Sequence, residues 1–238
     1  MLYTPDHHTS LGSLSDAHLA DLVRVWADRT AALLAEPDIR SVFVFENRGE
    51  ATGATLSHPH GQIYALPFPP PRLRRIGRIE ARLRARGPGG CPMCTTLQTE
   101  RAEGVRIVDE VEGSWLGYVP FAARMPYEVT LAPHRCVDRL DRLDPEEVTA
   151  LGRLLGRTVR RYDALFGFPL PYMMAVLQAG SDRLSPGGAP GHLRLSFWPV
   201  QRSALRLKFL ASSEALGGLF LVDVMPEDAA GRLRQVPS

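Results

Sequence analysis

Two long segments of the chain have the apolar spacing of an amphipathic helix. The first covers residues 16–34 and follows Ser15, a favourable N-cap residue. Its apolar positions are Leu19, Leu22, Val23, Trp26 and Leu33. The second begins at residues 144–147, Asp-Pro-Glu-Glu, which combine an N-cap, a proline in the first helical position and acids in the first turn. This pattern predicts a helix that ends at about residue 166, and residues 72–86 predict a third helix.

Short runs rich in β-branched and aromatic residues predict strands between these helices. The predicted strands cover residues 41–46, 58–66, 106–110, 115–120, 127–132, 172–178 and 192–200. Glycine and proline mark the predicted loops at residues 47–57, 87–90 and 179–190. Residues 67–71, Pro-Phe-Pro-Pro-Pro, can continue neither a strand ladder nor a helix, so they predict a linker.

The order helix, strand, loop, strand occurs twice, with histidines at matching places. In the first copy His58 follows His7 by 51 residues, and in the second His192 follows His134 by 58 residues. An internal repeat explains both the order and the histidines. The alternative is a coincidence of two α+β segments, which accounts for the order of elements alone.

Composition and charge exclude several classes of protein. The 238 residues are 45% hydrophobic and 23% charged, as in a soluble globular chain large enough to bury a core. The formal net charge of +2 gives no strong basic field for nucleic acid or an anionic membrane. No apolar run approaches the roughly 18–20 residues of a membrane span, and the N-terminus lacks the pattern of a signal peptide. Three cysteines are too few for a disulfide scaffold, so we expect a cytoplasmic protein.

The segment His58-Pro59-His60-Gly61-Gln62 is the strongest candidate for chemistry. In an extended strand its two histidines and Gln62 share one face, as a polar ladder about 13 Å long. A neutral imidazole can attack phosphorus and later leave, and a neighbouring amide can bond phosphoryl oxygens. The alternative is a structural pair of histidines whose nitrogens are satisfied by their neighbours.

Residues 45–62 resemble the active-site segment of the galactose-1-phosphate uridylyltransferase family, in the histidine-triad superfamily. The likeness rests on Phe45-Glu46-Asn47, on glycines 49 and 53, and on His-Pro-His-Gly-Gln. It extends to residues 4–11, 119–135 and 207–214. The resemblance implies an α+β fold in which two histidine-triad-like repeats form an antiparallel sheet with helices packed on it.

The first repeat is incomplete in this interpretation. Residues 1–71 form its C-terminal part, residues 72–90 form a linker helix with a Gly-rich turn, and residues 91–238 form the second repeat. Met1 falls in the middle of an expected strand, and the family builds much of its uridine pocket from the part before it. We therefore expect a truncated chain, through either a true truncation or a misassigned start.

The resemblance also implies a ping-pong nucleotidyl transfer. His60 would attack the α-phosphorus of UDP-glucose and release glucose 1-phosphate, and galactose 1-phosphate would then collect the uridylyl group from the histidine. Phosphate contacts would come from the polar residues that match the family motif: Asn47, Thr55 and Gln62. A C-terminal segment would reach the active site of a neighbouring subunit and implies a homodimer with shared sites; its matching residues are Lys208, Phe209 and Glu214.

Two metal sites are suggested, one in each repeat. Cys91 and Cys94 form a CxxC pair, and repeat alignment adds His134 and His192 to give a Cys₂His₂ zinc set. The alternatives are a redox pair or plain buried thiols, and Cys136 is interpreted as ordinary packing. In the first repeat His7 and His58 match the family's zinc histidines, but the matching cysteines are absent. We therefore predict an empty or weak site there.

Some family members carry an iron site in the second repeat. Its positions correspond here to Gln178, Arg194 and Ser196, so we predict no iron. Arg194 also occupies the place of His60, so the second repeat supplies no nucleophile.

Two further hypotheses stay open. One is a related nucleotidyltransferase or phosphorylase that uses another nucleoside-diphosphate sugar or a dinucleoside polyphosphate. The other is a catalytically inactive fragment that serves as a zinc-stabilised binding module.

Overall fold

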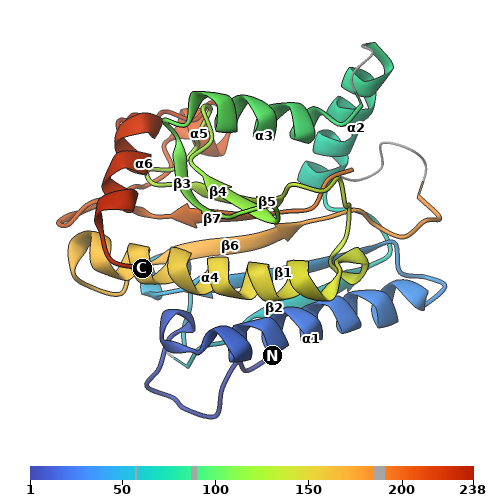
Figure 1. The fold of residues 1–238 in the computed structure, drawn as a ribbon, viewed down its shortest axis with the longest axis horizontal. Helices are drawn as coiled ribbons and strands as arrows, with labels where there is room; N and C mark the ends of the chain where they lie inside the picture. Colours follow the sequence, from blue (N-terminus) through green and yellow to red (C-terminus); the bar gives the residue numbers. More distant parts are fainter. Residues whose placement is uncertain (57, 87–89, 185–190) are drawn as a thin grey trace.

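The computed structural model describes residues 1–56, 58–86, 90–184 and 191–238. These residues form a mixed α/β fold around a seven-stranded antiparallel sheet with the order β2-β1-β6-β7-β5-β4-β3 (Figure 1). The strands of the sheet are β1 (Ser41–Arg48), β2 (Gln62–Leu66), β3 (Ile107–Val111), β4 (Trp115–Tyr118), β5 (Val129–Pro133), β6 (Tyr172–Leu177) and β7 (Arg194–Pro199). A small hairpin follows, made of β8 (Gln201–Ser203) and β9 (Arg206–Leu207).

Helices cover both faces of the sheet. The described helices are α1 (Asp16–Ala35), α2 (Pro71–Arg86), α3 (Pro92–Glu103), α4 (Pro145–Phe166), α5 (Ser212–Ala215) and α6 (Pro226–Gln235). Figure 1 shows α1 and α4 side by side below the sheet, with α2 and α3 on the opposite side. The main core lies between the α1–α4 layer and the sheet, and its large buried side chains include Trp26, Tyr162, Tyr172 and Phe197.

The antiparallel pair β1–β6 joins the two halves of the chain into one sheet. Phe45 lies opposite Ala175 and Asn47 lies opposite Met173 in this pair. In each half a long helix precedes a strand, a loop and an antiparallel partner strand: α1 precedes β1 and β2, and α4 precedes β6 and β7. The predicted fold class, an antiparallel sheet with helices packed on it, is confirmed.

The helix starts predicted from capping residues are also confirmed. The Ser15 side chain accepts a hydrogen bond from the backbone N–H of His18. Asp144 accepts from the backbone N–H of Glu147, while the Glu147 carboxylate accepts from the backbone N–H of Asp144. This capping box satisfies two donors that the first turn of α4 leaves free. Gly167, with φ of 75°, then ends the helix in the left-handed conformation.

The predicted strand over residues 58–66 is only partly right, because β2 begins at Gln62. The segment before β2 pairs with the chain's first residues: the Tyr3 N–H donates to the Pro59 carbonyl, and the Gly61 N–H donates to the Met1 carbonyl. His60 forms an isolated bridge with Leu2. Proline lacks the N–H that a continuous ladder needs, so the polar face predicted for one strand is divided between a loop and a strand.

Several other elements differ from the sequence prediction. β1 continues through Arg48, two residues into the predicted loop. The predicted linker ends where α2 begins, with Pro71 in its first position. Helices α3 and α6 were not predicted at all. The predicted breaks at residues 87–89 and 185–190 lie outside the described residues.

Candidate functional site

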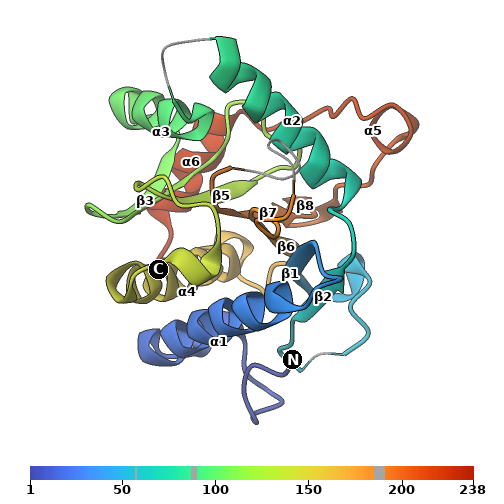
Figure 2. The ribbon, with the colours of Figure 1, turned by 90° about the vertical axis from the view of Figure 1, so that its right-hand side faces the viewer.

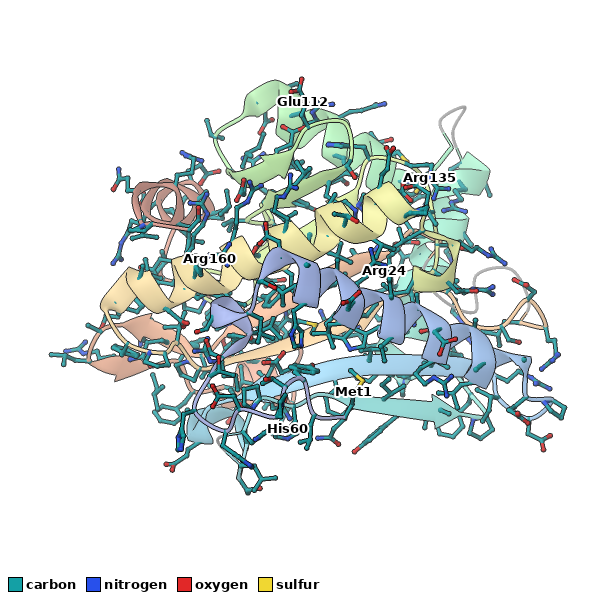
Figure 3. The ribbon with its side chains drawn as sticks, turned by 60° about the horizontal axis from the view of Figure 1, so that its bottom comes forward. Met1, Arg24, His60, Glu112, Arg135 and Arg160 are labelled. Carbon is teal, nitrogen blue, oxygen red and sulfur yellow. The ribbon has the colours of Figure 1, made fainter. Side chains whose placement is uncertain are left out.

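Four of the expected site residues line one cavity at the end of β1: Asn47, Thr55, His58 and His60. β1 supplies Asn47, the loop after it supplies Thr55, and the segment before β2 supplies His60. The cavity has a volume of about 310 Å³ and is named here the His60 cavity. Figure 3 shows His60 and Met1 close together at this edge of the sheet. The loop can turn sharply here because Gly49 and Gly53 adopt φ angles of 86° and 84°.

The backbone fixes the orientation of the His60 ring. Its Nδ1 lies 2.8 Å from the carbonyl oxygen of His58. A carbonyl oxygen only accepts hydrogen bonds, so Nδ1 must carry the proton and the neutral ring leaves a lone pair on Nε2. Within the described residues Nε2 makes no hydrogen bond. The ring therefore offers an unprotonated nitrogen for nucleophilic attack.

His58 and His7 contact each other directly. The His58 Nε2 lies 2.7 Å from the Thr4 carbonyl, so this nitrogen donates, and the His58 Nδ1 lies 2.7 Å from the Nδ1 of His7. His58 is buried and His7 is exposed. Over the described ranges no cysteine or carboxylate completes a group of three possible ligands around them. The predicted weakness of a metal site here stays a prediction.

A buried acid lies next to the same cavity. Glu46 lines the cavity and is 4% exposed, and its Oε1 accepts a hydrogen bond of 3.0 Å from the Tyr172 hydroxyl. Burial raises the pKa of Glu46 to about 7, against the opposing effect of the Tyr172 hydrogen bond. Sequence analysis assigned no role to Glu46. A signal was present, because Glu46 continues the core-facing alternation of Val42 and Val44.

Beneath the histidine segment, the Tyr3 ring packs against Gly61. A Cβ atom added to Gly61 would lie 2.0 Å from the Tyr3 hydroxyl oxygen, so only glycine fits at this place. Burial of Tyr3 first, and the nearby charge of Glu46 second, raise the pKa of the phenol. Glycine in the His-Pro-His-Gly-Gln segment is thus explained by close packing under His60.

The other expected substrate contacts lie outside the His60 cavity. Gln62 stands opposite Phe45 in the β1–β2 pair and does not line the cavity. Lys208 instead bonds within its own segment, with its Nζ 2.5 Å from the Glu214 Oε1 and 2.9 Å from the Leu221 carbonyl. Phe209 beside it is 76% exposed. Within a single chain, the structure therefore does not bring the C-terminal set to His60.

A cluster of possible metal ligands forms in the second half of the chain. The ligand atoms of Cys91, Cys94, Cys136 and His192 all lie within 4.8 Å of one another. The His192 Nδ1 is 3.4 Å from the Cys91 sulfur and 3.6 Å from the Cys94 sulfur. Its Nε2 donates to the Pro133 carbonyl at 3.0 Å, which directs the Nδ1 lone pair toward the sulfurs. Three sulfurs and one oriented imidazole are a donor set that fits Zn²⁺.

The cluster contains Cys136 in place of His134, which the sequence analysis had predicted as the fourth ligand. The His134 Nε2 lies 3.0 Å from the Glu110 Oε1, so its ring faces β3. β5 ends at Pro133 and the chain turns there, which brings Cys136 to the sulfur cluster two residues later. The interpretation of Cys136 as ordinary packing is therefore corrected. Repeat alignment could not find it, because it has no counterpart in the first repeat.

The thiols of the cluster influence one another. Burial raises the pKa of Cys91, but the hydrogen bonds with His192, the Cys94 backbone and Cys136, together with the nearby charge of His192, outweigh it and bring the value to about 6. Burial and the neighbouring Cys91 raise the pKa of Cys136 to about 12. One thiolate in contact with neutral thiols is the expected state of such a set without a cation.

The positions matched to the family's iron site make structural contacts. The Gln178 side-chain oxygen accepts from the backbone N–H of Leu140 at 3.1 Å. Arg194 forms a buried ion pair with Glu80, with an Nη1–Oε1 distance of 3.0 Å. Ser196 lies on β7 opposite Ala175. The absence of iron stays a prediction.

A search of the described residues finds no helix with the length and apolar character required to cross a membrane.

Comparison with known proteins gives the family. The family model for the N-terminal domain of galactose-1-phosphate uridyl transferase matches residues 1–70, and the model for its C-terminal domain matches residues 86–238. The galactose-1-phosphate uridylyltransferase of Thermotoga maritima is 38% identical over 236 residues, which cover 99% of this chain and 72% of that protein. The enzyme of Streptomyces lividans is also 38% identical, over 98% of this chain and 67% of that protein.

Solved structures agree with the sequence comparison. A structure described as a uridylyltransferase superposes with a TM-score of 0.91 at 30% identity, over 98% of this chain and 73% of that chain. An ADP-glucose phosphorylase from Arabidopsis thaliana with bound ADP-glucose shares the fold, with a TM-score of 0.86 at 23% identity. The two family models together cover nearly the whole sequence, and the candidate site has the geometry described above. The chain therefore belongs to the galactose-1-phosphate uridylyltransferase family.

Proposed function

We propose that this protein transfers a uridylyl group from UDP-glucose to galactose 1-phosphate through a covalent intermediate on His60. The observation that carries the proposal is the His60 ring, whose Nδ1–H is held by the His58 carbonyl while Nε2 stays free beside a cavity. An amide and a hydroxyl line the same cavity, at Asn47 and Thr55, and such groups bond phosphoryl oxygens.

The proposed first step is an in-line displacement at the α-phosphorus of UDP-glucose. The Nε2 lone pair forms an N–P bond, the bond from phosphorus to the bridging oxygen breaks, and glucose 1-phosphate leaves with that electron pair. In the second step a phosphate oxygen of galactose 1-phosphate attacks the same phosphorus and the N–P bond breaks. No proton transfer to His60 is required, because the ring both attacks and leaves through Nε2.

The test is labelling with UDP-glucose that carries ³²P at the α-phosphate. We expect acid-labile label on the protein and release of one glucose 1-phosphate for each label. His60→Asn removes the nucleophile and should abolish both, while His8→Asn, at an exposed histidine outside the cavity, should retain them. Label that persists on the His60→Asn protein, or wild-type protein that neither labels nor releases glucose 1-phosphate, contradicts the proposal.

The second site is proposed to hold one structural zinc ion. Its ligands would be Cys91, Cys94, Cys136 and His192, and when bound the ion would tie α3 to the ends of β5 and β7. Metal analysis of protein purified from zinc-supplemented medium should give one zinc per chain. Cys136→Ser should lower that content and His134→Gln should not. The reverse result would restore the Cys₂His₂ set and overturn the assignment of Cys136.

We further propose that the active enzyme is a homodimer. Residues 205–221 expose large apolar side chains that a neighbouring subunit could cover: Leu205, Phe209, Leu216, Leu219 and Leu221. Sedimentation velocity should give a dimer, and Phe209→Ser with Leu219→Ser should shift it toward the monomer. A monomeric wild-type protein that still turns over would contradict shared active sites. The division of the chain at residues 71 and 90 stays a proposal as well.

A further inference from the structure

A second cavity lies on the sheet face away from α1 and α4. Its volume is about 270 Å³, near the lower end of small-molecule sites, and it is named here the Trp198 cavity. Figure 2 shows α2 crossing this side of the sheet, and the first turn of α2 contributes to the cavity wall. Most of the wall is apolar and includes Phe43, Phe45 and Met173. Neither His60 nor Thr55 lines it.

An unpaired cation stands at this cavity. The guanidinium carbon of Arg72 lies 4.3 Å from the centroid of the Trp198 ring. Among the described residues no carboxylate lies within 4.0 Å of the Arg72 guanidinium nitrogens, and the remaining residues include no acid. Burial first, and the nearby charge of Arg124 second, lower the pKa of Arg72 to about 10. A guanidinium without a carboxylate partner at the mouth of an apolar cavity favours an incoming anion.

Two carboxylates on this side of the sheet contact groups other than Arg72. Glu80 pairs with Arg194 at 3.0 Å. The Glu128 carboxylate accepts the backbone N–H groups of Arg124 and Met125, at 2.6 and 3.4 Å. The charge of Arg72 is therefore not neutralised by a direct contact within the described part of the chain.

The cavity also has a polar group without a partner. The Trp198 indole N–H is buried, and the described residues give it no hydrogen-bond acceptor. Because this N–H is covered by protein atoms, the groups that the cavity offers a ligand are its aromatic walls and the guanidinium stacked on Trp198.

We propose that the Trp198 cavity binds a small organic anion with a flat apolar body. The anionic group meets the Arg72 guanidinium, and the body packs between Phe45 and the Trp198 ring. The cavity volume suits a molecule of one or two rings and is too small for a folded segment of another protein. The Trp198 cavity shares Asn47 with the His60 cavity, so the two cavities are neighbours, but the proposed nucleophile His60 does not line the Trp198 cavity.

Titration calorimetry with 2-naphthoate tests the proposal, with naphthalene-2-carboxamide as the neutral probe of the same shape. We expect one 2-naphthoate per chain, bound about tenfold more tightly than the carboxamide, which is the effect of one charge-assisted contact. Arg72→Gln should abolish this preference. Arg75→Gln, at an exposed arginine of the same helix, should leave it unchanged.

Two further variants test whether 2-naphthoate binds in the Trp198 cavity. Trp198→Phe should weaken both probes, since it removes part of the stacking surface. His60→Asn should bind 2-naphthoate as the wild type does, which separates this site from the His60 cavity. Equal binding of the two probes, a preference that survives Arg72→Gln, or affinity that falls as protein concentration rises because a second copy fills the cavity would each overturn the proposal.

Discussion

The buried carboxyl of Glu46 makes a quantitative prediction about stability and pH. Glu46 is 4% exposed, and its pKa rises from 4.5 to about 7, mainly through burial. The folded protein therefore holds this proton up to about pH 7, while the unfolded chain releases it above pH 4.5. Between these values the folded state binds more protons, so the free energy of unfolding falls as the pH rises. At 1.36 kcal/mol for each tenfold change in proton affinity, the loss is about 3 kcal/mol by pH 8.

The substitution Glu46→Gln isolates this contribution. Glutamine keeps the shape and an oxygen that can accept the Tyr172 hydrogen bond, but it does not ionise. Urea unfolding at pH 5, 6, 7 and 8 should show that the variant gains on the wild type by about 2.5 kcal/mol across this range, because the first part of the loss occurs below pH 5. Other buried acids titrate equally in both proteins, so they cancel in the difference. Glu50→Gln, at an exposed carboxyl of the following loop, is the matched control.

The shape of the difference decides the outcome. A constant offset between Glu46→Gln and wild type at all four pH values would show that the carboxyl titrates alike in the folded and unfolded states. A difference that grows as the pH falls would reverse the sign and refute the argument from desolvation. An equal trend in Glu50→Gln would assign the effect to net charge and not to burial.

Three further predictions concern contacts that hold the site and the long helix in place. Gly61→Ala should destabilise the protein by about 1–3 kcal/mol in urea unfolding, and Tyr3→Phe should recover part of this, because the added methyl overlaps the phenol. Arg48→Met should lower the unfolding free energy by about 2 kcal/mol in the same assay, because it removes the two hydrogen bonds of 2.8 and 3.1 Å that Arg48 donates to the Asp163 carboxylate. A loss below about 0.5 kcal/mol would show that this ion pair contributes no more than an exposed pair does. Asp144→Ala should lower the unfolding free energy by about 1 kcal/mol and Asp144→Asn by much less, and equal losses would exclude the capping explanation.

Local patterns were sufficient where local forces decide the structure. The helices α1 and α4 follow from apolar spacing and from the caps at Ser15 and Asp144, and both start where predicted. Helix α3 was missed because its sequence buries few side chains: Leu97 and Glu100 are its buried residues. With so few buried positions, no apolar period is visible in the sequence. Sequence analysis interpreted the CxxC pair as part of a metal site and did not recognise the helix that begins between the two cysteines.

The parts of the site that depend on distant residues could not be predicted. The segment at His60 is held by Tyr3, which lies more than fifty residues earlier in the chain, so its departure from a regular strand has no local signal. Cys136 joins the sulfur cluster because of where the chain turns after β5, which spacing does not reveal. A family resemblance suggested the role proposed for His60 and included Glu46 in its motif, but it gave no sign that the Glu46 carboxyl is buried beside the cavity.

Matching positions in the two halves of the sheet differ in whether the side chain keeps an unpaired reactive atom. His60 and Arg194 occupy matching places in the two halves. His60 lies two residues before β2 and Arg194 is the first residue of β7, and each stands two residues after a histidine. Arg194 is tied to Glu80 at 3.0 Å, and His192 before it bonds both a carbonyl and the sulfur cluster. His60 has one nitrogen tied to its own backbone and one left facing a cavity. A side chain can attack a substrate only where one of its reactive atoms is unpaired, and of these two positions only His60 keeps such an atom among the described residues.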